Sequence, residues 1–351
     1  MRFYSMIYLL GIPLWMSYAI SNQGEPIKDI VVIDTLREEL PISIDYDNHT
    51  VTPTINIEID NKVFTLVFDS GSYGVRVLRG AFAKKIPDTT NERLSYSYGS
   101  GLHTIHLRGQ VITENLRIGH VQTAVPTKIM LIDSTRSSMD SNWTTTGDSA
   151  RIRSNHFRNL AGILGFGLRY NRSGKGVYSP LSKLAGSGKF IIKFPYFGGT
   201  RGKLIINPSG KEQEGFMLFH LKPGKSLLPD GTQSWQDNQL SACLIIDGAS
   251  FCQPTLLDSG NPDIQLFLSG FNEKGTISSG SFITMEVKDL SDSAKRIKAG
   301  FLIPVAKERG KDYVYFAETT TEQHCVFGIR IFFEFNVLYD SKNGIIGLRR
   351  R

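Results

Sequence analysis

Two short stretches decide how this chain folds: VFDSGS at Val67–Ser72 and LLDSG at Leu256–Gly260. In each of them Asp-Ser-Gly directly follows an apolar run, which is the pattern of a buried strand that ends in a tight turn. Downstream of the first stretch lies ILG at Ile163–Gly165, and downstream of the second lies VFG at Val326–Gly328. Because the same elements occur in the same order in both halves, the sequence contains a weak internal repeat.

Strand patterns dominate the sequence around these stretches. VTPTINIEI at Val51–Ile59 largely alternates apolar and polar residues, whereas VFTLVF at Val63–Phe68 is almost continuously apolar, as a strand covered on both faces would be. Helical periodicity is scarce, and the best short helix is expected at Ser179–Leu184. The sequence therefore predicts an all-β protein. Further strands are expected at Phe190–Phe194, Lys203–Ile206, Ala242–Ile246 and Asn336–Tyr339, with turns at Asp60-Asn61, Gly198-Gly199 and Asp247-Gly248.

The chain has 351 residues, which is long enough for two domains of ordinary size. Its content of 40% hydrophobic and 21% charged residues is that of a globular protein. Residues 134–158 are rich in Ser, Thr, Asn and Arg and predict an exposed loop, and the polar stretch 208–214 predicts a connection between lobes. We therefore expect an N-terminal lobe over 46–207, which holds Asp69, and a C-terminal lobe over 208–351, which holds Asp258.

The N-terminus is typical of an export signal. Arg2 gives a positive start, Tyr4–Met16 is largely apolar, and Ser17-Tyr18-Ala19 offers small residues for cleavage. We expect a cleaved signal peptide over 1–19, a short N-terminal segment over 20–45, and a secreted or periplasmic protein. An uncleaved membrane anchor is the alternative, although the apolar run is short for a bilayer span. No later segment has eighteen consecutive apolar residues, so we expect no stable membrane insertion.

The net charge of +7 raises the question of a nucleic-acid partner. Lys and Arg are scattered among Asp and Glu, and small clusters such as Arg349–Arg351 are expected to face solvent. No basic stripe carries interleaved aromatic residues, so nucleic acid is not an expected partner. His103 and His106 lack a nearby Cys or Glu that would complete a metal site. We expect neither a metal nor a cofactor.

Two Asp-Ser-Gly turns, one in each half, supply the parts of a metal-free peptide hydrolase. Hydrolysis needs one group to take a proton from water and another to protonate the carbonyl oxygen or hold it by a hydrogen bond. Two neighbouring carboxyls can do both, because close carboxylates cannot both ionise and one of them keeps a proton. Glycine lets the backbone bend tightly enough to bring two such aspartates together.

In this pattern the chain resembles the pepsin-like aspartic proteases. The resemblance implies a bilobal fold, with two β-rich lobes and an active-site cleft between them. Each matching stretch alone is a weak or moderate signal, but the ordered set is specific and spreads over residues 50–348. The five stretches are VFDSGS at Val67–Ser72, YGSG at Tyr98–Gly101, GILGFG at Gly162–Gly167, LLDSG at Leu256–Gly260 and VFGIRIFFEFNVLYDSKNGIIGL at Val326–Leu348.

The resemblance also implies roles for the residues of the two turns. Asp69 and Asp258 would be the catalytic pair that holds the attacking water. Ser70 and Ser259 match the hydroxyls that crosslink the turns, and Ser72 matches the hydroxyl that steadies the first aspartate. The expected supporting residues are Ser70, Gly71, Ser72, Ser259, Gly260 and Asn261.

A second implied feature is the flap, a mobile hairpin that closes over substrate and excludes water. Tyr98, Gly99, Ser100 and Gly101 match its tip. By this match we expect Tyr98 to matter much more for cleavage than Tyr96, which lies two residues back on the same strand face. A simple surface aromatic is the alternative for Tyr98.

The sequence departs from the family in four places. Asn261 stands where the family usually has Ser or Thr, and an Asn would donate to Asp258 with a different reach. Arg76 occupies the position at which many members have a Trp bonded to the flap tyrosine. The second half is shorter than the first. The segment from Ile20 to about Tyr46 is short and more acidic than basic, so we expect activity without loss of a long propeptide.

Cys243 and Cys252 are expected to form a disulfide. The segment ACLIIDGASFCQ predicts a hairpin with Asp247-Gly248 as a type I′ turn, and pairing outward from that turn sets the two cysteines opposite each other. The fourth pair from the turn is a non-hydrogen-bonded one, whose Cα atoms are close enough for a bridge. Reduced cysteines are the alternative, and Cys325 is expected to stay free and buried.

The sequence therefore predicts an aspartic endopeptidase, a monomer that cleaves protein or peptide substrates at acidic pH. The alternative is a catalytically inactive pepsin-like fold that binds a protein or a glycan. Both Asp-Ser-Gly turns are intact, which favours the enzyme, whereas Asn261 and Arg76 favour the binding module.

Overall fold

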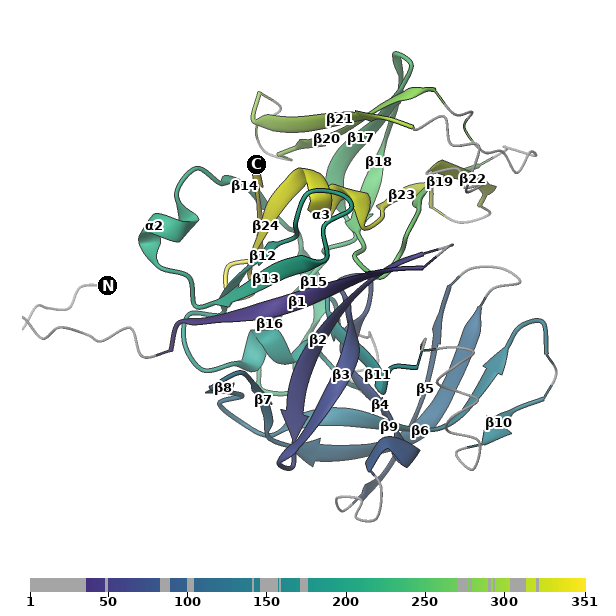
Figure 1. The fold of residues 1–351 in the computed structure, drawn as a ribbon, viewed down its shortest axis with the longest axis vertical. Coiled ribbons are helices and arrows are strands. Elements are labelled where there is room, and N and C mark those ends of the chain that lie inside the picture. The colour runs from purple at the N-terminus through teal and green to yellow at the C-terminus, as the bar shows by residue number, and fades with distance from the viewer. Residues whose placement is uncertain are drawn as a thin grey trace, which may run out of the picture. The chain divides into compact units, whose positions relative to one another are not determined.

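Figure 1 shows the fold in a computed structural model, which describes the chain from Leu36 to its end with internal gaps. The segment Met1–Thr35, with the expected signal peptide, lies outside the described residues, and Leu36–Arg351 is a separate compact unit. The described residues are 36–47, 50–82, 89–99, 104–140, 142–145, 157, 159–170, 176–269, 277, 280–289, 292, 294–303, 314–319 and 322–351.

Within these residues, sixteen strands form one large sheet. Its main path runs in the order β14-β25-β24-β12-β13-β1-β2-β3-β11-β4-β9-β6-β5, and β7, β8 and β10 pair beside it. The strands are β1 (Glu38–Tyr46), β2 (Val51–Ile59), β3 (Lys62–Asp69), β4 (Tyr73–Leu78), β5 (Thr89–Tyr98), β6 (Ile105–Glu114), β7 (Leu116–Ile118), β8 (Val121–Gln122), β9 (Thr127–Ser137), β10 (Thr144–Thr145), β11 (Gly162–Phe166), β12 (Lys189–Lys193), β13 (Arg201–Ile206), β14 (Met217–His220), β24 (Phe335–Asp340) and β25 (Ile345–Arg350).

A second sheet has the strand order β21-β20-β17-β18-β23-β19-β22. It consists of β17 (Leu240–Ile246), β18 (Ala249–Leu257), β19 (Ile264–Leu268), β20 (Phe282–Lys288), β21 (Arg296–Leu302), β22 (Val314–Glu318) and β23 (His324–Phe327). A separate ribbon pairs β15 (Pro223–Leu227) with β16 (Gln233–Trp235). The helices within the described residues are single turns: η1 (Arg79–Phe82), η4 (Pro180–Lys183), α2 (Gly210–Gln213) and α3 (Arg330–Glu334). The prediction of an all-β fold is therefore confirmed, and Ser179–Leu184 does contain a short helix, of the 3₁₀ type.

The internal repeat of the sequence is also a repeat of strand pairing. The hairpin β2–β3 leads to Asp69. There β3 pairs in parallel with β11, β11 pairs antiparallel with β4, and β4 pairs in parallel with β9. In the second sheet the hairpin β17–β18 leads to Asp258. There β18 pairs in parallel with β23, β23 pairs antiparallel with β19, and β19 pairs in parallel with β22. ILG and VFG are thus the central strands of two equivalent sets of four.

Two expected boundaries do not coincide with breaks in the sheets. β1 lies between β13 and β2 in the large sheet, although the sequence suggested only a short N-terminal segment up to residue 45. The C-terminal strands β24 and β25 join the same sheet through β12, so the large sheet takes strands from both expected lobes. The predicted loop over 134–158 is shorter than expected, because β9 continues to Ser137 and β10 lies within it.

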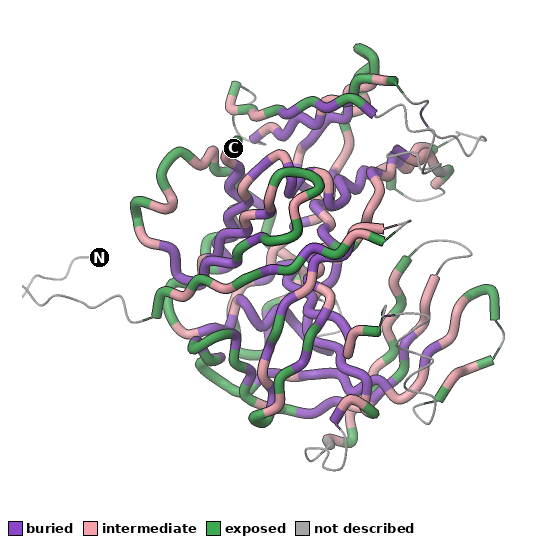
Figure 2. The backbone as a smooth tube through the Cα atoms, in the orientation of Figure 1, coloured by how far each residue is buried: buried purple, intermediate pink, exposed green. Residues whose placement is uncertain are grey.

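The core of the folded unit is a large cluster of buried Ile, Leu, Val and Phe side chains. In Figure 2 burial follows the central strands of the sheets, whereas exposed residues gather at turns and outer hairpins. Phe68, which directly precedes Asp69, is completely buried and stacks on Phe166 at 4.2 Å. Leu257, which directly precedes Asp258, is 1% exposed. Both aspartates therefore follow residues that are fixed in the core, and this limits how far their turns can shift.

The predicted hairpin and its disulfide are confirmed. Strands β17 and β18 pair Ile246 with Ala249 next to the turn and Cys243 with Cys252 at the fourth position, and a disulfide joins these two cysteines. Asp247 and Gly248 both have positive φ, at 46° and 92°, as the type I′ turn requires. Cys325 is free and buried, as expected.

Candidate active site

Asp69 and Asp258 sit at equivalent places in the two sheets. Asp69 is the last residue of β3, opposite Gly165 of β11, and Asp258 follows β18, with its backbone N–H donating to the carbonyl of Phe327 at 2.9 Å. Both aspartates are partly exposed, whereas the serines that follow them are buried. Each turn therefore presents its carboxyl outward from a core that holds the rest of the turn.

Reciprocal hydrogen bonds join the two turns. The Ser70 N–H donates to Ser259 Oγ at 3.0 Å, and the Ser259 N–H donates to Ser70 Oγ at 2.8 Å. Each hydroxyl also donates to the carbonyl that precedes the opposite aspartate, Ser70 to Leu257 and Ser259 to Phe68, both at 2.8 Å. Because these bonds are buried, they fix the relative placement of the two aspartates.

The glycines of the two turns allow the carboxyls to come together. A Cβ added to Gly71 would stand 2.2 Å from Cγ of Asp258, and a Cβ added to Gly260 would stand 2.5 Å from Oδ1 of Asp69. Each carboxyl therefore packs directly on the glycine of the other turn. Any larger residue would collide with the opposite aspartate, which explains why each Asp-Ser pair is followed by Gly.

The two carboxyls differ in their hydrogen-bond donors. Asp69 accepts from Ser72 Oγ at 2.6 Å and from the Gly71 N–H at 2.8 Å, whereas Asp258 accepts from the Gly260 N–H at 3.0 Å. The side-chain oxygen of Asn261, at the position that resembles Ser72, instead accepts from the N–H of Asp263 at 3.0 Å.

Asp258, the carboxyl with fewer donors, has a shifted pKa. Burial, the charge of Asp69 and a hydrogen bond to Asp69 raise the pKa of Asp258 well above its ordinary value of 3.8. A carboxyl whose pKa is raised keeps its proton to higher pH, so Asp258 is the candidate acid of the pair.

The expected flap is a hairpin of β5 and β6, and it ends with Tyr98 opposite Ile105. Gly99 follows with a φ of 84°, a turn conformation that favours glycine. Ser100 and Gly101 lie outside the described residues, and so does His103. His106 lies on β6 and contacts the hydroxyls of Ser97 and Ser138.

The rings of Tyr96 and Tyr98 have different neighbours, which the sequence did not suggest. The Arg76 guanidinium lies 3.5 Å from the ring centre of Tyr96, and Tyr73 meets the same ring edge-on at 6.1 Å. Burial raises the pKa of Tyr96, and the charge of Asp69 also raises it. The ring of Tyr98 lies beside Phe157 at 6.4 Å.

Arg76 is almost completely buried, with 1% of its surface exposed. Nη1 donates to the carbonyl of Gly74 at 3.3 Å, and Nε has no hydrogen-bond partner in the part of the chain that the structure describes. Burial lowers the pKa of this guanidinium, while the charges of Tyr96, Tyr73 and Asp69 act in the opposite direction. A cation thus stands behind the first turn, at the place where the resemblance suggested a Trp.

Arg169 and Asp237 are site residues that the sequence reasoning missed. Nη2 of Arg169 donates to the carbonyl of Gly71 at 2.6 Å, and its Nε lies 3.1 Å from Oδ1 of Asp237. Asp237 is buried and also accepts from the Leu168 N–H at 2.6 Å. The only available signal was that Arg169 follows GILGFG by two residues; nothing in the sequence marks Asp237 as its partner.

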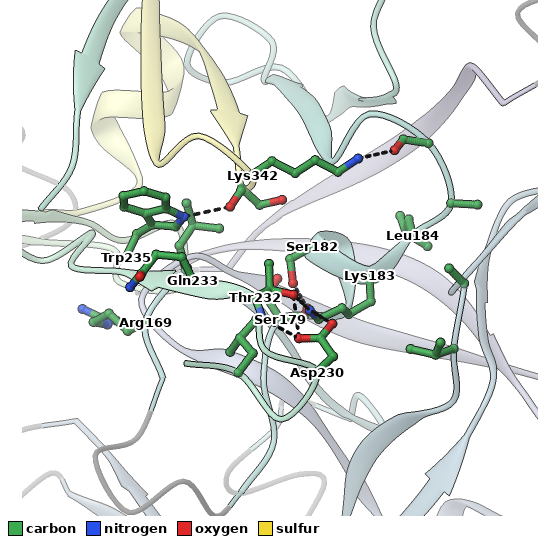
Figure 3. Close-up of a pocket in the computed structure, with 18 residues that line it drawn as sticks. Arg169, Ser179, Ser182, Lys183, Leu184, Asp230, Thr232, Gln233, Trp235 and Lys342 are labelled. Carbon is green, nitrogen blue, oxygen red and sulfur yellow. Dashed lines mark hydrogen bonds and ion pairs between the residues drawn. The ribbon is translucent and has the colours of Figure 1, made fainter. Parts of the chain in front are cut away.

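A cavity of about 270 Å³ lies next to this arginine. Figure 3 shows Lys183, Asp230 and Thr232 in contact on one side of it, while Arg169 is set apart from them. Trp235 forms another part of the lining and donates from its ring nitrogen to the carbonyl of Ser341 at 2.8 Å. Neither Asp69 nor Asp258 lines this cavity, so it is distinct from the aspartate pair.

No known family model matches the chain, and no curated protein matches it. Among the described residues, no group of three or more His, Cys, Asp or Glu side chains could hold a metal ion. The same residues include no helix that is long and apolar enough to cross a membrane.

Proposed function

We propose that this chain is an aspartic endopeptidase in which Asp69 and Asp258 activate a water molecule for attack on a peptide bond. One observation carries the proposal: two Asp-Ser-Gly turns from equivalent strands are crosslinked by their serines, so that each carboxyl rests on the glycine of the other turn. The resemblance to pepsin-like aspartic proteases supports the same conclusion and adds the cleft between two lobes.

The asymmetry of the pair supports a division of roles. Asp69, which receives two hydrogen bonds, is the general base and takes a proton from the attacking water. Asp258, whose pKa is raised, keeps the shared proton and protonates the carbonyl oxygen or holds it by a hydrogen bond. Peptide hydrolysis by this route needs no covalent intermediate.

The proposed activity has an acidic optimum, because the working form of the pair carries one proton. Deprotonation of Asp258 leaves two close carboxylates without an acid, and protonation of Asp69 removes the base. The two apparent pKa values of the pH profile belong to the pair and not to either residue alone.

The test is cleavage of a denatured mixed-peptide substrate between pH 3 and 7, with the products identified by mass spectrometry. Asp69→Asn and Asp258→Asn should each lower turnover by about 10³-fold or more while leaving the fold intact. Asp45→Asn, an exposed change of the same chemistry on β1, is the control. Near-normal turnover in either site variant would refute the two-aspartate mechanism.

The second candidate is a catalytically inactive fold that binds a protein or a glycan. Asn261 favours it, because its side-chain oxygen binds the backbone of Asp263, where the resemblance calls for a hydroxyl beside the second aspartate. Pepstatin distinguishes the two candidates. The enzyme should be inhibited by pepstatin and stabilised against thermal unfolding, whereas a binding module should show neither cleavage nor protection.

The remaining expectations are part of the proposal. The substrates are proteins or peptides, and the working form is a monomer that carries no metal or cofactor. Export depends on the expected signal peptide over 1–19, which lies outside the described residues. A secreted or periplasmic location fits the disulfide between Cys243 and Cys252, because disulfides persist in oxidising compartments.

A further inference from the structure

We propose that Arg169 is a positioning residue for the aspartate pair: its guanidinium, anchored by Asp237, holds the backbone of Gly71 against both carboxyls and places a fixed positive charge beside them. The inference rests on the proposed function, because it assigns a role within that same site. It concerns a residue that contacts the first turn and not the substrate.

Gly71 contacts both carboxyls of the pair. Its N–H donates to Oδ1 of Asp69 at 2.8 Å, and its Cα faces Asp258 so closely that an added Cβ would stand 2.2 Å from Cγ. The carbonyl of the same residue is the acceptor for Arg169, at 2.6 Å. A shift of the Gly71 backbone would therefore change the surroundings of both carboxyls at once.

Arg169 is itself held in place from two directions. Its Nε contacts Asp237, which is only 2% exposed and whose other oxygen accepts from the Leu168 N–H. The backbone of the same loop binds the first turn, because the Gly167 N–H donates to the carbonyl of Ser72 at 2.8 Å. A charged donor that is fixed in this way gives a stronger hydrogen bond than a mobile surface arginine would.

The charge of Arg169 acts on the pair as well as its hydrogen bond. A nearby cation favours the ionised form of a carboxyl, so Arg169 lowers the pKa of Asp258 and partly offsets the effects of burial and Asp69. Loss of the cation should therefore raise the apparent pKa values of the pair and move the activity profile to higher pH. The charged and titratable groups that face the pair are Asp69, Asp258, Arg76, Arg169, Tyr73, Tyr96, Asp237 and Tyr339.

Three variants separate the charge from the geometry. Arg169→Gln removes both the cation and the fork of donors, whereas Arg169→Lys keeps the cation and loses the fork. Arg79→Gln is the matched control, because Arg79 is also paired with an aspartate, Asp133, and its side chain has the same exposed fraction of 19%.

The first measurement does not depend on cleavage. Aspartate carboxyls labelled with ¹³C are titrated by NMR in the full-length protein, with Asp69→Asn and Asp258→Asn used to assign the pair. Arg169→Gln should raise the apparent pKa values of the pair, while Arg169→Lys and Arg79→Gln should leave them near those of the unmodified protein. Unchanged values in Arg169→Gln would overturn the inference, whether or not the protein cleaves peptides.

The second measurement is the pH profile of kcat/KM on a cleaved peptide. Arg169→Gln should lower kcat/KM by about ten- to a hundredfold and move the acidic limb upward, whereas Arg169→Lys should lower it without moving the limb. If Arg169→Gln does not fold, Asp237→Asn replaces it. This variant keeps the Arg169 cation but removes its anchor, so it should lower kcat/KM without moving the acidic limb. A profile of Arg169→Gln that matches Arg79→Gln would also overturn the inference.

Discussion

Tyr96 and Tyr98 share one face of β5, but their rings have different neighbours. Tyr96 lies against the buried Arg76, and the charge of Asp69 raises its pKa, whereas Tyr98 packs beside Phe157. A cation held against an aromatic face in a buried site contributes more than it would at the surface. Tyr96 and Arg76 therefore pack against each other beside the first turn, and Arg76 stands where the resemblance suggests a Trp bonded to the flap tyrosine.

We expect Tyr96→Ala to lower kcat/KM by about tenfold or more and Tyr98→Ala to lower it less, which reverses the ranking suggested by the motif. The reason is that loss of the Tyr96 ring leaves the buried Arg76 cation with only the more distant Tyr73 ring, at 5.8 Å. Tyr96→Phe keeps the ring and should retain most of the activity. Steady-state kinetics on one cleaved peptide would check this, and a larger loss in Tyr98→Ala would restore the original ranking.

At the scale of elements, the parts predicted best from the sequence were those whose signal is local. The strand Val51–Ile59 has the same bounds as β2, and the hairpin around Asp247-Gly248 was predicted to the residue, because alternation and turn chemistry are both short-range properties. The two aspartate turns were predicted from a motif that occurs twice. Sequence order alone was enough to show that ILG and VFG occupy equivalent places.

The parts that could not be predicted depend on contacts between distant segments. β1 alternates core-facing Leu40, Ile42, Ile44 and Tyr46 with exposed residues, so its own sequence favours a strand but does not show that it lies between β13 and β2. The partnership of Arg169 with Asp237 joins residues 68 positions apart. Neither residue type is unusual in a loop, and only the fold shows that they meet.

The position of β1 predicts where the chain can be shortened. A chain that begins at Leu36 should fold and keep its thermal stability, because it retains β1 and the bidentate contact of Arg37 with Glu212. A chain that begins at Val51 loses a strand with neighbours on both sides and should not fold, since the loss is comparable to a total stability of about 5–15 kcal/mol. Circular dichroism and thermal melting of the two proteins would decide this. Activity of the chain that begins at Val51 would contradict this prediction.

The hairpin β17–β18 carries the other prediction at this scale. The disulfide between Cys243 and Cys252 closes a short loop, with a sequence separation of 9, and should contribute about 2–3 kcal/mol by restricting the unfolded chain. Cys252→Ser should lower the melting temperature of the oxidised protein, whereas Cys325→Ser should leave the bridge intact. Mass mapping under non-reducing conditions checks the pairing. A link from Cys325 to either partner, or three alkylatable thiols in exported protein, would show that it is wrong.

At the scale of the whole molecule, two kinds of carboxyl give stability opposite dependences on pH. Glu212 is held by Arg37, which lowers its pKa from 4.5 to about 2, so the stability it contributes is present above 4.5 and is lost as the pH falls towards 2. Asp258 has a raised pKa, so the folded state binds more protons than the unfolded state between 3.8 and that raised value. Stability from this group falls as the pH rises through that window.

Asp258→Asn should therefore make the protein more stable at neutral pH while it abolishes the proposed activity. At pH 7 the substitution removes a carboxyl that is costly to ionise beside Asp69, and an amide of almost the same size can keep the hydrogen bond from the Gly260 N–H. The gain should shrink as the pH falls towards 3.8, because the carboxyl of the unmodified protein then takes up its proton. Thermal unfolding of both proteins at several pH values, with Asp45→Asn as the exposed control, measures this difference. A site variant that is less stable than the unmodified protein at pH 7, or equally stable at every pH, would mean that the two carboxyls do not oppose each other, and the shared-proton mechanism would lose its physical basis.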